Sequence, residues 1–336
     1  MPMEPKILAL QFKYFGDAVL MTPALRAIRE KFPHGELHVL VPEPIAPVLQ
    51  HLPWVNRVWP MPRNRGRASL GLTWPVIRAL RRERFDSSVD FATNDRGAIL
   101  SFLIGAKQRL GWADGGGFVG RKYCYNQRVV PENKIQPESA RLAHLLSGWD
   151  LTTSSLIAEI HADPALAASA KELLPPETVI CHLASSQSKK EWPLTHWAAL
   201  HRMAVAAGIK LIFGTGVGAR EEALLKDFQK LAPTASVLKP IPDLALYLAV
   251  LGQARAFVSG DTGPLHFAAG LGVPTLALFG PSSPAQWAPI GLQHRFLIGS
   301  DCACGNVGTC QSANHCLDAI TPEQVLAELR KLSPAI

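Results

Sequence analysis

The sequence predicts an α/β protein with two doubly wound, mostly parallel domains that face each other across a cleft. Short apolar runs alternate with helical patterns in both halves of the chain, which is typical of parallel sheets covered by helices. The 336 residues are enough for two domains of ordinary size. Because ligands of such sheets bind beyond the carboxyl ends of the strands, residues that follow each strand are the candidates for function.

The first half begins with a strand, a Gly16-Asp17 turn and a helical pattern that is expected to kink or restart at Thr22-Pro23. The strands of this half are expected at 6–12, 37–41, 55–59, 87–91 and 108–111, and the helices at 18–32, 48–52, 76–84, 98–104 and 137–149. Composition turns to Thr, Ser, Ala and Pro over 151–176, which indicates the domain boundary.

The second half repeats the alternation. Its strands are expected at 179–183, 210–213, 237–238, 256–258 and 275–279, and its helices at 194–207, 220–231, 244–253 and 322–332. We therefore expect an N-terminal domain over 1–160, a C-terminal domain over 161–320, and a last segment, 321–336, whose helix packs back toward the N-terminal domain.

The stretch from Ser259 to Gly280 holds one short helix between two strands, with Asp261 and Thr262 as its expected capping residues. A tight turn into a helix start presents backbone N–H groups at a positive helix end, which suits a diphosphate. Gly263 would let the backbone approach a ligand, and His266 would point near the same place. The alternative is an ordinary α/β turn with a cap and a core histidine.

Three further turns carry polar side chains. Asp17 follows the first strand, where an anion would repel phosphate, so we expect a base or a hydroxyl-binding carboxylate, with a helix cap as the alternative. The loop 185–193, with its hydroxyls and two lysines, suits a diphosphate or is a plain polar loop. The glycine-rich turn 214–222, with carboxylates at a helix start, suits ribose hydroxyls, with Glu that simply favours a first helical turn as the alternative. No G-x-G-x-x-G follows the first strand, which argues against NAD.

The charge is uneven. Residues 1–150 hold 21 Lys and Arg against 13 Asp and Glu, whereas the remainder holds 13 against 14. The basic half is expected to face an anionic partner, either nucleic acid, a phospholipid surface or an acidic glycan, unless it is simply a soluble basic surface. Its densest patches are Arg63, Arg65 and Arg67, then Arg78 to Arg84, without the interleaved aromatic residues of a single-strand binder.

Four of the six cysteines, Cys302, Cys304, Cys310 and Cys316, form a C-x-C-x5-C-x5-C cluster. The spacing departs from paired C-x2-C zinc sites, so the sequence favours reduced thiols that stabilise a loop, with structural zinc as the alternative. No apolar run of about 18 residues and no leader pattern is evident, so the expected location is the cytoplasm.

Three stretches in order, GDAVLMTPALRAIREKFP, KKEWP and DTGPLHFAAGLGVPTLALFGPSSP, resemble the lipopolysaccharide heptosyltransferases of glycosyltransferase family 9. The resemblance spans nearly the whole chain, and the KYFGD turn is most similar to the heptosyltransferase III type. It implies a GT-B fold, with the acceptor on the first domain and the nucleotide sugar on the second. It also implies inverting transfer from ADP-L-glycero-D-manno-heptose to the inner core, without metal or cofactor.

Carried over by position, the resemblance makes Asp17 the general base and Lys190 the lysine that neutralises the leaving diphosphate. It assigns the nucleotide sugar to Ser185, Ser186, Glu221 or Glu222, Asp261, Thr262, Gly263 and His266. The acceptor is assigned to the basic half, at Arg63, Arg65, Arg67 and Arg96. Gln11, where many members carry a basic residue, and Ser185-Ser186, which replaces a Thr pair, depart from the pattern.

The implied partners are an ADP-sugar, an anionic glycolipid and, peripherally, the inner membrane surface, with no nucleic acid. Three alternatives remain at this level. One is a GT-B enzyme that uses another nucleotide sugar or acceptor glycan. The second is a nucleotide-binding protein without transfer activity, against which the presence of Asp17 and Lys190 argues. The third is a nucleic-acid binder, which rests on the basic half alone.

Overall fold

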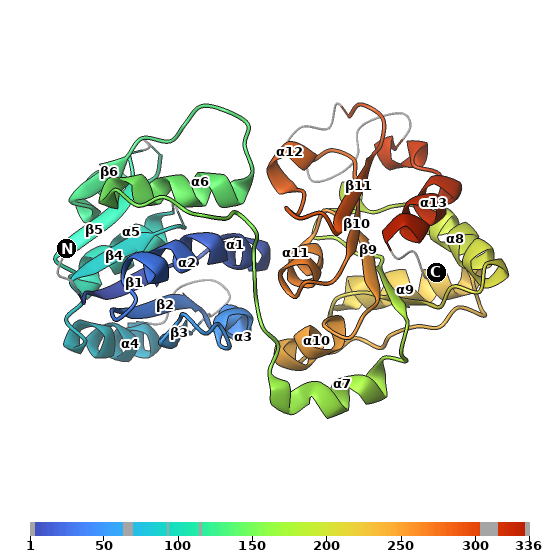
Figure 1. Ribbon diagram of the computed structural model, residues 1–336, viewed down its shortest axis with the longest axis horizontal. Helices are drawn as coiled ribbons and strands as arrows, with labels where there is room; N and C mark the ends of the chain where they lie inside the picture. Colours follow the sequence, from blue (N-terminus) through green and yellow to red (C-terminus); the bar gives the residue numbers. More distant parts are fainter. Residues whose placement is uncertain (1–3, 63–69, 93, 114–115, 303–314, 333–336) are drawn as a thin grey trace. The chain divides into compact units, whose positions relative to one another are not determined.

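The computed structural model describes residues 4–62, 70–92, 94–113, 116–302 and 315–332. The chain forms two compact units, Met1–His161 and Ala162–Ile336, each with its own parallel sheet (Figure 1). Within the described residues, none of the helices is long and apolar enough to cross a membrane.

The first unit contains a six-stranded parallel sheet in the order β3-β2-β1-β4-β5-β6. The strands are β1 (Lys6–Leu10), β2 (Glu36–Pro42), β3 (Arg57–Met61), β4 (Ser87–Asp90), β5 (Gln108–Trp112) and β6 (Gln127–Val129). The helices are α1 (Phe15–Leu20), α2 (Thr22–Lys31), α3 (Ala46–Leu49), α4 (Leu70–Arg82), α5 (Asp95–Ile104) and α6 (Glu138–His144). The sequence did not predict β6, which is three residues long.

The expected break at Thr22-Pro23 is present between α1 and α2. Pro23 lies in the first turn of α2, where its missing N–H costs no helical hydrogen bond. The residue at the N-cap position is Met21 rather than Thr22, and the Thr22 hydroxyl instead donates to the Val19 carbonyl at 2.7 Å. The break keeps Asp17 in a short helix of its own, directly after β1.

The second unit contains a five-stranded parallel sheet in the order β11-β10-β9-β7-β8. The strands are β7 (Val179–His182), β8 (Leu211–Gly214), β9 (Ala256–Gly260), β10 (Thr275–Phe279) and β11 (His294–Ile298). The helices are α7 (Ala167–Leu173), α8 (Leu194–Ala206), α9 (Ala219–Leu231), α10 (Leu244–Leu251), α11 (Gly263–Gly270), α12 (Pro284–Trp287) and α13 (Pro322–Leu332).

The second unit differs from the expectation at residues 237–238 and at α7, and the sequence did not predict β11 or α12. Residues 237–238 make an isolated bridge between Val237 and Phe213 rather than a strand. Helix α7 lies within residues 151–176, where the composition indicated the domain boundary and no helix was expected. Helix α13 buries Val325, Leu326 and Leu329 in the core of the second unit, against α8 and β10. That it also returns toward the first half stays a prediction.

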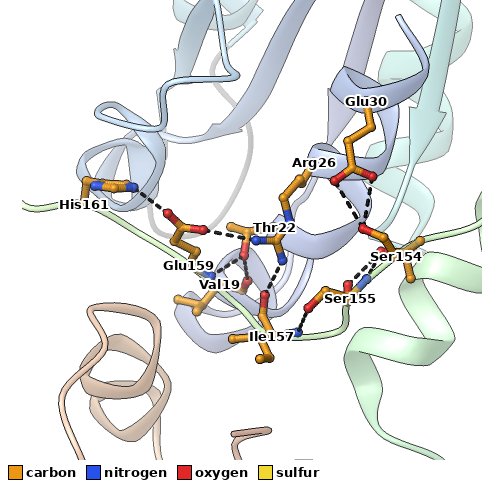
Figure 2. Close-up of polar contacts among 10 residues, drawn as sticks. Val19, Thr22, Arg26, Glu30, Ser154, Ser155, Ile157, Glu159 and His161 are labelled. Carbon is orange, nitrogen blue, oxygen red and sulfur yellow. Dashed lines mark hydrogen bonds and ion pairs between the residues drawn. The ribbon is translucent and has the colours of Figure 1, made fainter. Parts of the chain in front are cut away.

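The segment before the unit boundary is bound to α2 of the first unit (Figure 2). Arg26 donates to the Ile157 carbonyl at 2.7 Å and pairs with Glu159 at 3.1 Å. The Glu159 amide donates to the Thr22 hydroxyl at 3.0 Å, and Ser154 donates to the Glu30 carboxylate. These contacts explain why the compact first unit extends to His161, beyond the change of composition at 151.

Candidate active site

The predicted diphosphate loop, residues 185–193, and the predicted turn at Asp261–Gly263 meet in the second unit. Strands β7 and β9 are neighbours in the sheet, so the segments that follow them lie together at its carboxyl edge. Lys190 follows β7 and Asp261 follows β9, and the Lys190 Nζ donates to Asp261 Oδ2 at 2.6 Å. The Asp261 side chain is 7% exposed and that of Lys190 is 21% exposed. The ion pair therefore lies at the boundary between the buried interior and the solvent.

Gly260, the last residue of β9, allows this approach. A Cβ atom added at Gly260 would lie 2.3 Å from the Lys190 carbonyl oxygen, closer than such atoms can come. The backbone of the lysine loop, residues 185–193, therefore packs directly on the end of β9. This contact joins two backbone segments of the protein, and the expected approach of Gly263 to a ligand stays a prediction.

Ser185 belongs to the same group. Its side chain is buried, and its hydroxyl donates to the Asp261 carbonyl at 3.5 Å. Its amide donates to Glu191 Oε1 at 2.8 Å, and its carbonyl accepts from Arg220 at 2.9 Å. Arg220 also forms two hydrogen bonds to the Glu191 carboxylate, at 2.6 and 2.7 Å, so the loop after β7 is held to the start of α9.

The other loop candidates are less enclosed. Ser186 and Glu222 are exposed, whereas Glu221 is partly buried with its carboxylate 3.7 Å from Arg220. Gly218, at φ 154°, ends the glycine-rich turn, and a Cβ there would lie 2.5 Å from Glu221 Oε2. The structure thus brings Glu221 to the Arg220–Glu191 pair and leaves Glu222 facing solvent.

The start of α11 corrects the expected capping. Thr262 occupies the N-cap position, but its side chain makes no capping hydrogen bond, and the Asp261 carboxylate bonds Lys190. The local pattern predicted a cap because Asp and Thr commonly bond the first helical amides. Here Asp261 has a cationic partner 71 residues away, and such charge-assisted bonds are the stronger ones.

His266 is buried one turn into α11. Burial lowers the pKa of its imidazole, the nearby Asp261 raises it and Lys190 lowers it further. At neutral pH the ring is therefore uncharged, and it can offer a hydrogen bond but no positive charge. Its ring centroid lies 6.5 Å from that of Trp287 on α12, which places the Gly280–Trp287 loop beside the same group.

A cavity of about 330 Å³ lies beside the Lys190–Asp261 pair. Its lining is largely polar. The lysine loop forms one side of the cavity, and the segment after β10 forms the other. The lining residues are Gln187, Lys189, Lys190, Pro281, Ser282, Ser283, Gln286 and Trp287. The buried Ser282 hydroxyl has no hydrogen-bond partner among the described residues. The cavity thus combines cations and hydroxyls, as an anionic, hydroxyl-rich ligand requires.

Asp17 lies in the first unit, as the third residue of α1. Its carboxylate is buried and accepts the Tyr14 amide at 3.2 Å. Burial raises the pKa of Asp17, and the charge of Glu138 raises it further, whereas Lys13, the Tyr14 amide and Arg141 lower it. Glu138 is itself buried and bonded to Arg141 at 2.5 and 2.7 Å. A carboxylate in such a place is a stronger base than an ordinary aspartate.

A family model described as "Glycosyltransferase family 9 (heptosyltransferase)" matches residues 73–315. The chain belongs to glycosyltransferase family 9. It is 24% identical to lipopolysaccharide heptosyltransferase 2 of Salmonella typhimurium, over 97% of this chain and 98% of that protein. It is 26% identical to lipopolysaccharide heptosyltransferase 1 of Pseudomonas aeruginosa, over 89% and 85% of the two chains.

Solved structures of the family share the fold. A family 9 glycosyltransferase from Veillonella parvula superposes with a TM-score of 0.81 at 20% identity, covering 100% of this chain and 99% of that one. ADP-heptose lipopolysaccharide heptosyltransferase II of E. coli superposes with a TM-score of 0.78 at 20% identity, covering 97% and 98%. These likenesses confirm the predicted GT-B fold with two parallel α/β sheets.

Two residues that hold the loop 185–193 of this family 9 enzyme were given no role from the sequence. Glu191 lies in KKEWP and Arg220 in the turn 214–222, and their pairing joins residues 29 positions apart. The segment Pro281–Ser283 also lines the cavity and was given no role, although it lies near the end of the third stretch that resembles the family. Its two serine hydroxyls, which follow β10, were the sequence signal for this part of the site.

The acceptor and cysteine predictions fall largely outside the described residues. Arg63, Arg65 and Arg67 are not among those described, and neither are Cys304 and Cys310. Arg96, on α5, lies over the Phe12 ring at 4.9 Å and donates to the Pro62 carbonyl at 3.4 Å. Cys316 is buried in the core of the second unit, and Cys302 packs against it. Among the described residues no cluster of three or more His, Cys, Asp or Glu could hold a metal.

Proposed function

We propose that this enzyme transfers L-glycero-D-manno-heptose from ADP-heptose to the inner core of lipopolysaccharide, with inversion at the anomeric carbon. Support comes from the family, from relatives named as lipopolysaccharide heptosyltransferases, and from an E. coli heptosyltransferase solved with ADP, which this chain matches at 20% identity. The observation that carries the proposal is the Lys190–Asp261 pair beside a polar cavity of about 330 Å³.

Lys190 is the group that stabilises the leaving diphosphate. An ammonium has three N–H donors and Asp261 accepts one, so Lys190 can bind a phosphate oxygen without leaving Asp261. Ser185 and the start of α11 supply further donors at Thr262 and Gly263. The neutral His266 adds a hydrogen bond, and Glu221, held by Arg220, binds the ribose hydroxyls. Ser186 and Glu222 are exposed, so they contact the donor only at the solvent-facing edge of its site.

Asp17 is the general base that takes the proton from the acceptor hydroxyl. Its buried position removes the stabilisation that water gives a carboxylate, so the proton is held more strongly than by an exposed aspartate. Asp17 belongs to the first unit and Lys190 to the second, so each unit supplies one of the two proposed catalytic residues. The acceptor is an anionic glycolipid that meets the basic first half at Arg63, Arg65, Arg67 and Arg96.

The competing proposal is a GT-B enzyme with another nucleotide sugar or acceptor glycan. The two departures from the family pattern, Gln11 and Ser185-Ser186, motivate this competing proposal. Gln11 is fully buried, and its amide oxygen accepts from the Lys13 amide at 3.2 Å, so it supports the turn before Asp17. The basic residue that many members carry before this turn therefore has no counterpart at this position.

The deciding experiment pairs binding with transfer. A ligand at about 100 times its Kd adds roughly 2.7 kcal/mol of stability, so a thermal-shift series with ADP-heptose, ADP-glucose, UDP-glucose and GDP-mannose identifies the donor. Transfer is then followed by mass spectrometry on core oligosaccharides with and without the first heptose. A shift with ADP-heptose and a gain of one heptose on the acceptor is expected. A larger shift with a UDP- or GDP-sugar would contradict the proposed donor.

A further inference from the structure

Helix α4 exposes apolar and cationic side chains along one side. Leu72 is 51% exposed and Trp74 is 49% exposed, and the next turns present Arg78 and Arg82, which are also exposed. Trp74, Pro75, Arg78 and Arg82 line a groove of about 230 Å³. The thirteen residues of α4 include three arginines and no acidic residue. Exposed apolar side chains that gather beside polar or charged ones are typical of an interaction surface.

Helix α5 continues this surface. Ile77 and Leu80 of α4 and Leu100 and Ile104 of α5 pack into one apolar cluster against the strands of the first sheet. Both helices therefore cover the same face of the sheet, and their outer sides look away from it. On its outer side α5 exposes Ile99 and Phe102, at 44% and 54%. The Arg109 guanidinium lies 5.8 Å from the Phe102 ring, which adds a further cation.

We propose that this surface, the α4–α5 face, binds an anionic lipid bilayer. It consists of Leu72, Trp74, Pro75, Arg78 and Arg82 on α4 with Ile99 and Phe102 on α5. A basic helix with exposed Trp and Leu lies in the interface of a membrane, where the indole rests at the level of the headgroups and the guanidinium groups meet lipid phosphates. The charge of α4 is complementary to such a surface.

The biological reason for membrane binding rests on the proposed function, because a lipid-anchored acceptor would bring the enzyme to a membrane. The binding itself involves neither donor nor acceptor. The α4–α5 face belongs to the first unit, so the lysine loop and cavity of the second unit contribute no residue to it.

The test is cosedimentation of the full chain with vesicles that contain no glycolipid. Vesicles of phosphatidylethanolamine with phosphatidylglycerol should retain the protein, and phosphatidylcholine vesicles should not. The Leu72→Ser, Trp74→Ser double variant and the Arg78→Glu, Arg82→Glu double variant should each lower the partition coefficient by about tenfold or more. The charge-reversed variant should also lose most of the salt dependence.

Matched controls lie on the second unit. Leu292→Ser removes a fully exposed leucine, and Arg202→Glu with Lys226→Glu makes the same charge change on α8 and α9. Both controls should bind vesicles like the parent. All the replaced side chains are exposed or half-exposed, and unchanged unfolding temperatures verify that the variants fold.

Three results would overturn the proposal. The first is equal vesicle binding by the parent and both α4 variants. The second is an equal loss in the controls, which would make net charge the cause. The third is a parent dimer, without vesicles, that the Leu72→Ser, Trp74→Ser variant breaks, which would make this face an interface between copies. Transfer to a soluble, deacylated core acceptor is assayed in parallel. If transfer fails while vesicle binding behaves as expected, the proposed function fails and the membrane surface stands.

Discussion

Replacing Lys190 with methionine should reduce turnover by about two to three orders of magnitude while the enzyme stays folded. Losing one preorganised donor to a developing anion costs about 2.7–4 kcal/mol of transition-state stabilisation. The Lys190 side chain is 21% exposed, so water screens part of its charge and the lower end of that range is expected. Methionine keeps the length of the aliphatic stem and removes only the ammonium.

The structure predicts a second effect of the same change. Asp261 is 7% exposed and bonded to Lys190 at 2.6 Å, so Lys190→Met leaves a nearly buried carboxylate without this partner. Breaking a fully buried pair costs about 3–5 kcal/mol. Because the Lys190 side chain is 21% exposed, we expect the free energy of unfolding to fall by only about 1–2 kcal/mol. For a unit of this size that lowers the unfolding temperature by roughly 2–8 °C.

A double variant separates the two effects. Lys190→Met with Asp261→Asn removes both charges, so the stability should return toward that of the parent while turnover stays low. The measurements are thermal unfolding and initial rates of ADP release at saturating donor, with Lys226→Met on the exposed side of α9 as the control. Recovery of turnover to within about tenfold in the double variant would refute the reasoning. Lys190 would then serve only to neutralise Asp261.

Three further predictions concern the base and the lysine loop. Asp17→Asn should lower turnover by at least about a hundredfold with donor affinity within a few-fold of the parent, measured by steady-state kinetics and calorimetry; parental turnover would remove Asp17 from this role. The raised pKa of Asp17 means that the base is lost as pH falls through a value above the ordinary 3.8. Glu138→Gln removes a negative charge and leaves the Arg141 cation, so the acid limb of kcat/KM should move to lower pH; a limb that stays in place or rises would contradict this. Gly260→Ala should destabilise the enzyme by about 1–3 kcal/mol, because its Cβ would lie 2.3 Å from the Lys190 carbonyl, whereas Gly252→Ala meets only contacts of 3.5 Å or more; equal effects in thermal unfolding would argue against the close packing.

The sequence by itself determined the fold class and most of the regular elements. Strand β10 and helix α13 have the bounds that the apolar runs predicted, and α2 begins where Thr22-Pro23 indicated a restart. Such features depend on side-chain periodicity and on proline geometry within a few residues, which a single sequence displays directly. Elements with a weak local pattern were missed. β6 is three residues long, and α7 lies in a stretch of small residues typical of a linker.

Only the tertiary structure decided how the candidate residues are paired. Asp261 had the local signature of a helix cap, but the parallel pairing of β7 with β9 places Lys190 beside it. The basicity of Asp17 depends on burial and on Glu138, which lies more than 100 residues further along the chain. Local propensity covers one or two helical turns, whereas burial and charge proximity follow from which strands become neighbours. Strand order is a property of the whole sheet, and no local stretch of the sequence contains it.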